Sequence, residues 1–254
     1  MAASTPAKRL DLFLLAHHDD EVFCAGHLSR ALTSGRPVRL LWATAGGLAP
    51  ARRRVAEGLR VREALGLPAG AAADLLLRDQ HAVEHVHVIV REVVRLVDRA
   101  EEIVVFVPAY EGGNPDHDAV NLAAALAVRA RPGLRVLEFS MYRRGAYGLD
   151  VQSPVAPAAT PPEPFDVLSL TDDDLALRRT LARANASQLA VSLAPLLTLA
   201  RLAGRGRAEP ARPLPAHDYT IPPHRGSLLY ELYTPWRFAA WSAAGGRAAA
   251  RSAP

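Results

Sequence analysis

Short apolar runs alternate along the chain with longer segments of helical spacing. Five runs have the length of strands, and they lie at residues 10–16, 38–44, 74–77, 103–108 and 134–139. Largely unbroken aliphatic runs are typical of strands that are buried on both faces of a parallel sheet. The pattern therefore predicts an α/β fold with a Rossmann-like, mostly parallel sheet, helices on both faces and a C-terminal extension.

The second half of the chain gives weaker signals. Residues 145–164 are rich in proline and alanine and predict a flap. The sequence TDDD at 171–174 supplies an N-cap and an acidic first turn, which together predict a helix over 171–193. Residues 204–215 resemble a flexible crossing segment, and residues 227–236 are consistent with one more strand.

These signals predict three parts of the chain. A core spans residues 8–204, and a C-terminal loop and strand over 205–241 complete the same domain. The Ala- and Arg-rich residues 242–254 are expected to form a disordered tail. A chain of 254 residues, half of them hydrophobic, is long enough to bury one full core.

Composition narrows the classes of partner. The net charge of +4 comes from arginines without interleaved aromatic residues, so we expect no nucleic-acid partner. The single cysteine, Cys24, excludes an internal disulfide and suits a reducing compartment. The N-terminus lacks a signal-peptide pattern, and no run of about 18 apolar residues predicts a membrane span. We expect a cytoplasmic protein and leave its oligomeric state open, a homo-oligomer included.

Two polar clusters follow predicted strands. The sequence AHHDDE at 16–21 comes after the first strand, and YEGGNPDHD at 110–118 comes after the fourth. Ligands of parallel sheets gather beyond the carboxyl ends of the strands. Two histidines and an aspartate from adjacent strand ends would form a three-ligand site with an open fourth position, as in catalytic zinc sites. The alternative for the first cluster is a purely structural role, because Asp and Glu are common in the first turn of a helix.

Both clusters resemble the motifs of one family. AHHDDE is similar to AHPDDE, and GGNPDHDAV is similar to GGHPDHDA, of the LmbE-like or PIG-L family of zinc-dependent N-acetylglucosaminyl deacetylases. Arg54 and Glu57 with ALGL, and the stretch LEFSMYRRG, resemble further family segments. The likeness covers about residues 8–145 and continues loosely to DYTIPPH and LYELYTPW.

The resemblance implies a metal site and a mechanism. His17, Asp20 and His117 would bind Zn²⁺, although another divalent cation would also suit these ligands. Asp19 would be the general base for a water activated by the metal, and Asp116 would orient a ligand. The implied reaction releases an N-acetyl or similar N-acyl group from an amino-sugar-containing substrate, a small-molecule N-acetylated sugar conjugate.

Other positions are assigned to the substrate or depart from the family pattern. Arg54 is expected to face the substrate. Tyr110 and His224 are assigned to the mouth and wall of the pocket, but the sequence does not fix the direction of Tyr110, and a surface segment pinned by prolines explains His224 equally well. Asn114 replaces a motif histidine and belongs to the catalytic group, because its amide can donate to an oxyanion, although it cannot deliver a proton at neutral pH. His18 replaces a proline, and a partly exposed loop histidine is expected there rather than a pocket residue.

Three other functions are compatible with parts of the sequence. HAVEH at 81–85 fits the H-x-x-E-H pattern of zinc peptidases, but on a helix both histidines should point away from the apolar stripe and face solvent. A non-catalytic carbohydrate-binding relative would explain Asn114, whereas the retained Asp19 favours an enzyme. A nucleotide-binding oxidoreductase lacks support because no G-x-G-x-x-G opens the first helix.

Overall fold

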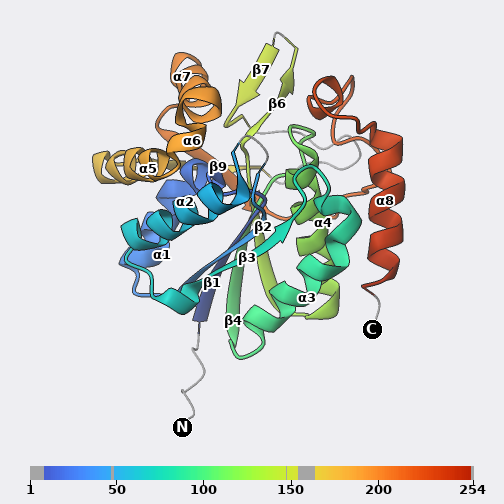
Figure 1. Ribbon diagram of the computed structural model, residues 1–254, viewed down its shortest axis with the longest axis horizontal. Coiled ribbons are helices and arrows are strands. Elements are labelled where there is room, and N and C mark those ends of the chain that lie inside the picture. The colour runs from blue at the N-terminus through green and yellow to red at the C-terminus, as the bar shows by residue number, and fades with distance from the viewer. Residues whose placement is uncertain (1–8, 47–48, 147, 154–163, 253–254) are drawn as a thin grey trace.

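A seven-stranded sheet forms the centre of the protein, in the order β3-β2-β1-β4-β5-β9-β8 (Figure 1). The computed structural model describes residues 9–46, 49–146, 148–153 and 164–252. The strands are β1 Arg9–Leu15, β2 Val38–Thr44, β3 Ala72–Leu77, β4 Glu102–Pro108, β5 Leu134–Phe139, β8 Asp166–Ser169 and β9 Ala208–Pro213. The first five pair in parallel, whereas β9 runs antiparallel to β5 and to β8. All five predicted strands and the α/β fold are confirmed.

Helices cover both faces of the sheet (Figure 1). One face carries α1 Ala25–Thr33, α2 Ala51–Ala64 and α5 Asp172–Ala184, and the other carries α3 Val86–Val97, α4 Pro115–Ala130 and α8 Phe238–Ala250. Leu12 and Leu14 of β1 pack into the second layer, and Phe13 and Leu15 pack into the first. Because successive side chains of a strand point to opposite faces, two covered faces require an unbroken apolar run.

The chain order creates a crevice between β1 and β4. From β1 the chain moves outward to β2 and β3, and from β4 it moves the other way to β5. The two central strands are neighbours, with Leu12 opposite Val105. In open parallel sheets such a reversal leaves a crevice at the carboxyl ends of the strands. Both polar motifs lie there, since one follows β1 and the other opens α4 after β4.

The helix predicted over 171–193 is interrupted. Thr171 and Asp174 form the capping box at its start, so the predicted N-cap is correct. The helix ends at Ala184, however, and the following segments are α6 Ala186–Gln188, the π-helix η4 Leu189–Leu193 and α7 Ala194–Leu202. Pro195 has no N–H for the carbonyl of Val191, so the turn before it widens, and Ala194 donates its N–H to Leu189 instead.

The predicted flexible crossing at 204–215 is wrong. Residues Ala208–Pro213 form β9, which is mostly buried and pairs with β5. Glu209 on this strand accepts the backbone N–H of Gly26 at 2.9 Å and pairs with Arg178 at 2.8 Å. Prolines and buried ion pairs replace the aliphatic side chains by which such a strand would be recognised.

The predicted strand at 227–236 and the disordered tail at 242–254 are also corrected. The first segment contains only the 3₁₀-helix η5 Tyr230–Leu232, and the second lies mostly within α8. Trp241, Ala244 and Ala248 recur at helical spacing and are buried against α3 and α4. The small alanines allow close packing, and Trp241 donates its indole N–H to the carbonyl of Pro115 at 3.0 Å.

The predicted flap near 145–164 lies partly outside the described residues. Its described part belongs to a hairpin of β6 Tyr142–Gly145 and β7 Gly148–Val151. This hairpin and α7 contact each other at the end of the molecule drawn at the top of Figure 1. Among the described residues, no helix has both the length and the apolarity needed to cross a bilayer.

Candidate metal centre

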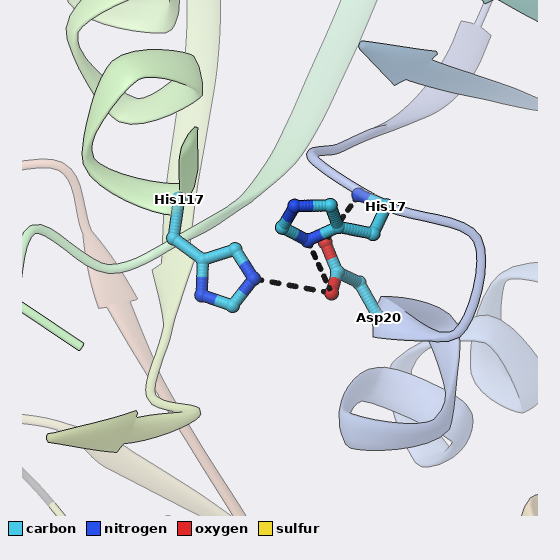
Figure 2. A group of neighbouring side chains, drawn as sticks. All are labelled: His17, Asp20 and His117. Atoms are coloured by element: carbon cyan, nitrogen blue, oxygen red, sulfur yellow. Dashed lines mark hydrogen bonds and ion pairs between the residues drawn. The ribbon is translucent and has the colours of Figure 1, made fainter. Parts of the chain in front are cut away.

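His17, Asp20 and His117 converge at the carboxyl ends of β1 and β4 (Figure 2). Asp20 Oδ1 lies 3.7 Å from His17 Nδ1 and 3.2 Å from His117 Nε2, and all three side chains are buried. The other carboxylate oxygen of Asp20 accepts the backbone N–H groups of Ala16 and His17 at 2.8 and 2.9 Å. These bonds turn Oδ1 toward both imidazoles, so the structure brings the three predicted ligands together.

The start of α4 places His117. Asn114 is the N-cap, and its Oδ1 accepts the backbone N–H of Asp116 at 2.8 Å, while Pro115 occupies the first turn, where no N–H is needed. Gly113 precedes the cap, and a Cβ at this position would collide with the carbonyl oxygen of Tyr142. The glycine therefore lets the loop pass close enough to bring His117 over β1.

Two carboxylates fix the orientation of the His17 ring. Asp116 Oδ2 and Asp79 Oδ1 lie 3.3 and 3.4 Å from His17 Nε2. Asp116 is itself held by the backbone N–H groups of Gln80 and Ala82 at 2.7 and 2.9 Å. A proton on Nε2 leaves the Nδ1 lone pair facing Asp20, which is the tautomer a metal requires. Sequence reasoning missed Asp79, although its position just after β3, at the same edge of the sheet, is a signal.

Asp19 lies beside the three converging side chains. Its Oδ1 is 3.2 Å from Arg54 Nη2, and its φ of 119° is in the left-handed region that non-glycine residues avoid. Such strain persists only where surrounding contacts hold it, and it concentrates at functional sites. Burial raises the pKa of Asp19 well above its usual range, although the charge of Arg54 opposes the shift. Asp19 is thus a stronger base than an exposed carboxylate.

The pKa of Asp20 moves the other way. Burial alone would raise it, but the charge and hydrogen bonds of His117 and His17 hold it below its usual value. Two neighbouring carboxylates therefore differ in basicity, and the ionised Asp20 is suited to bind a cation while Asp19 is suited to take a proton.

Arg54 is buried and fully engaged at the site. Besides Asp19 it contacts Glu57 at 2.7 Å and donates to the carbonyl of Ala45 at 3.1 Å. Glu57 in turn accepts the backbone N–H of Ser187 at 2.9 Å, which ties α2 to α6. Arg54 borders the cavity, and it also holds the carboxylate of Asp19 in place.

A cavity of about 510 Å³ opens above these residues. We call its charged side chains, together with the amides of Gln80 and Asn114, the polar floor: His17, Asp19, Asp20, Arg54, Asp79, Gln80 and Asn114. We call a second set, which is aliphatic apart from one phenyl ring, the apolar wall: Phe23, Met141, Leu149, Val191, Leu193, Pro195, Leu196 and Leu229. The lining is completed by Gly46, Tyr142, Gln188, Ser192 and Tyr233. Most of the wall comes from η4, α7 and the β6–β7 hairpin. Sequence reasoning missed it because these side chains carry no charge and no candidate chemistry.

The predicted pocket positions of Tyr110 and His224 are corrected. The Tyr110 ring is buried against Tyr219, with centroids 4.9 Å apart, and its hydroxyl donates to Ile221 at 2.8 Å. His224 Nδ1 lies 2.9 Å from the carbonyl of Arg225. Neither residue is among the described residues that line the cavity. Tyr110 follows β4 but turns into the layer of α4 and α8, a direction that spacing alone does not reveal.

The histidines of HAVEH lie apart from the site. The segment forms the 3₁₀-helix η3 Ala82–His85, and His81 Nδ1 contacts Glu84 at 2.9 Å. Neither His81 nor His85 belongs to a metal-compatible cluster of the described residues. The prediction that both histidines face solvent is only partly met, because both are half-buried. The predicted apolar stripe is buried.

His18 is a fully buried core residue, so the expected partly exposed loop position is wrong. Its ring packs on Trp42 with centroids 4.6 Å apart, and its Nε2 lies 2.8 Å from Asp74 Oδ1. A Cβ on Gly58 would collide with the imidazole, so α2 approaches closely at this point. The ring thus fills the space between the first motif and α2.

Glu111 is buried behind the second motif. Its Oε1 accepts the backbone N–H groups of Met141 and Tyr142, both at 2.8 Å. Its Oε2 lies 3.1 Å from Ser140 Oγ, whose one hydrogen can instead go to the carbonyl of Ser153 at 2.8 Å. A protonated Oε2 can donate to Ser140 Oγ. Burial favours this form by raising the pKa of Glu111 to about 7, against the effect of the N–H donors.

We expect Glu111→Gln to stabilise the protein relative to the parent as the pH rises above about 7. Glutamine reproduces the hydrogen bonds of the protonated acid. The folded-state pKa exceeds the usual 4.5, so stability from this group is complete below that value and is lost as the pH rises through about 7. The difference in Tm between variant and parent should grow between about pH 4.5 and pH 7 and level off above about pH 7. A constant difference would contradict a titrating Glu111.

Comparisons with known proteins agree with this geometry. Residues 12–128 match the family described as PIG-L, GlcNAc-PI de-N-acetylase. Curated proteins gave no match. The chain is similar to the A40926 pseudoaglycone deacetylase Dbv21, with 21% identity, a TM-score of 0.61, and coverage of 83% of this chain and 100% of that chain.

Two further solved structures are similar. The zinc-inhibited form of teicoplanin deacetylase Orf2 has 18% identity and a TM-score of 0.57, over 81% of this chain and 98% of that one. The N,N'-diacetylchitobiose deacetylase from Pyrococcus horikoshii, complexed with its inhibitor, has 19% identity and a TM-score of 0.54, over 92% and 90%. At these identities the likeness establishes a shared fold.

Proposed function

We propose that this chain, whose residues 12–128 match the PIG-L family, is a zinc-dependent hydrolase that removes an N-acetyl or similar N-acyl group from an amino-sugar-containing substrate. One observation carries the proposal. His17, Asp20 and His117 converge beside Asp19 at the floor of a cavity large enough for a small molecule. The similarity to deacetylases of sugar conjugates supports this choice of substrate.

The donor set fits Zn²⁺. His17, Asp20 and His117 offer two imidazole nitrogens and one carboxylate oxygen within 4.8 Å of one another, and catalytic zinc sites use three such ligands with a fourth position open. The lowered pKa of Asp20 suits a ligand that must be ionised. Bound zinc would supply a Lewis acid for the amide carbonyl and lower the pKa of water.

The remaining chemistry falls to the side chains of the floor. Asp19, held by Arg54, takes the proton of the attacking water as its oxygen bonds to the amide carbon. When the C–N bond breaks, the same proton passes to the departing nitrogen, giving acetate and a free amine. Asn114 uses its Oδ1 to cap α4, so its amide N–H₂, which faces the Tyr142 hydroxyl, is the group that would donate to the developing oxyanion.

The substrate is proposed to be a small-molecule N-acetylated sugar conjugate handled in the cytoplasm. A reducing compartment suits Cys24, a buried free thiol whose pKa burial raises well above its usual range. Such a thiol is a packing group rather than a nucleophile.

Metal removal tests the proposed function. Protein stripped by a chelator should release no amine from N-acetylglucosamine conjugates, and one equivalent of Zn²⁺ should restore release of amine and acetate in equal amounts. The parallel control is protein carried through the same steps without chelator. Zinc-loaded protein that binds the sugars but never releases acetate would contradict the proposal and favour a carbohydrate-binding relative.

A further inference from the structure

The proposed general base, Asp19, is held from two sides by buried carboxylates. On the backbone side, Glu21 Oε2 accepts the N–H of Asp19 at 3.1 Å. On the side-chain side, the guanidinium of Arg54 links Asp19 Oδ1, at 3.2 Å, to Glu57 Oε2, at 2.7 Å. Both glutamates are buried. Because the left-handed φ of Asp19 is strained, its conformation persists only as long as such contacts hold it.

Both glutamates are bound from one short segment, the junction, at residues 185–187, where α5 ends and α6 begins (Figure 1). Asn185 Nδ2 donates to Glu21 Oε1 at 2.6 Å. Ser187 donates its backbone N–H to Glu57 Oε1 at 2.9 Å and its hydroxyl to Glu57 Oε2 at 2.7 Å. The junction therefore reaches both sides of Asp19, each through one carboxylate.

The donors of the junction are fixed in direction. The Ser187 hydroxyl oxygen accepts from Arg54 Nη1 at 3.3 Å and from Gln188 Nε2 at 3.1 Å, so its single hydrogen is left for the glutamate. Asn185 Nδ2 also donates to the carbonyl of Leu181 at 3.1 Å, which uses its second hydrogen. Donors that are locked in this way set the orientation of the carboxylates they bind.

We propose that the junction positions the general base. Asn185 acts through Glu21 on the strained backbone of Asp19. Ser187 acts through Glu57 on the guanidinium that holds the Asp19 carboxylate. This inference rests on the proposed function, in which Asp19 takes the proton of the attacking water. A displaced base would leave substrate binding intact and slow the chemical step, because proton transfer requires hydrogen-bonding distance.

Loss of the junction's contacts should lower kcat selectively. The double variant Asn185→Ala with Ser187→Ala is expected to lose about tenfold in kcat on the methyl glycoside of N-acetylglucosamine, less than the roughly 10²-fold that a 1 Å misplacement can cost. KM should stay within about twofold of the parent's, since ground-state binding is untouched. Metal analysis should still find one zinc per chain, and circular dichroism should show a folded protein.

Single variants keep the test decisive if the buried Asn185 is needed for folding. Ser187 is half-buried, and Ser187→Ala alone should lower kcat by about threefold. Ser187→Thr keeps the hydroxyl and should retain the parent's kcat. Ser242→Ala is the matched control, because Ser242 is also half-buried and donates one hydrogen bond, to the carbonyl of Tyr219 on the far side of the sheet from α2. It should leave kcat unchanged.

A double-mutant cycle separates positioning from a general structural effect. With Asp19→Asn already present the base is gone, so adding the two junction substitutions should lower kcat by less than about twofold more. Equal losses with and without Asp19→Asn would overturn the inference, because the junction would then act on another group. A folded double variant with the parent's kcat, or a Ser187→Thr protein as slow as Ser187→Ala, would overturn it too. A zinc-loaded parent that hydrolyses nothing would instead overturn the proposed function, and the inference with it.

Discussion

Asp19→Asn is expected to lower kcat by about 10²–10⁴-fold while zinc stays bound, the range over which a positioned general base contributes. Asparagine keeps the size of the side chain and tolerates the left-handed φ of 119° better than most residues, so the local backbone should persist. It loses the proton-accepting carboxylate and the ion pair with Arg54. The three residues proposed to hold the metal are untouched.

Two measurements on one preparation check this expectation. Metal analysis should find one zinc per chain in variant and parent alike, while the rate of amine release falls. Asp98→Asn makes the same chemical change at an exposed position near the end of α3 and should leave both quantities unchanged. An Asp19→Asn protein that turns over at the parent's rate would remove Asp19 from the mechanism, and loss of zinc would make it a metal-holding residue.

The sequence was sufficient for the half of the fold that surrounds the site. The boundaries of β2 and β5 match their apolar runs, because strands covered by helices on both faces need mostly apolar sequence. The meeting of His17 and His117 was predictable for a related reason. Their motifs follow two strands that become neighbours where the direction of the sheet reverses.

The rest depends on contacts between distant segments. Glu209 can lie in a buried strand because its carboxylate is paired with Arg178. The two residues are 31 positions apart, so no local pattern of the sequence reveals the pair. Asp79 enters the site only because β3 ends at the same edge as β1. The position of the apolar wall depends on the turn that widens before Pro195. Nothing in the sequence around Val191 indicates that this side chain borders the cavity.

His117→Ala is expected to lower both zinc affinity and activity. Removal of a residue that only hydrogen-bonds to a metal ligand costs roughly 10–100-fold in affinity, and removal of a ligand itself should cost more. The change deletes the only proposed ligand that comes from the second motif and leaves Asp20 Oδ1 without the imidazole 3.2 Å away. The helix should survive, because Asn114 still caps α4 and alanine favours helix.

His85→Ala is the control for the loss of a histidine, since it lies in the HAVEH segment outside the metal-compatible clusters of the described residues. Zinc titration by calorimetry and thermal unfolding by circular dichroism should show a folded His117→Ala protein with weak zinc binding and an unaffected His85→Ala protein. Together with Asp19→Asn, the set separates the two halves of the site: one variant loses turnover and keeps zinc, and the other loses both. If His117→Ala kept one tightly bound zinc, the ion would lie elsewhere and the convergence of the two motifs would need another explanation.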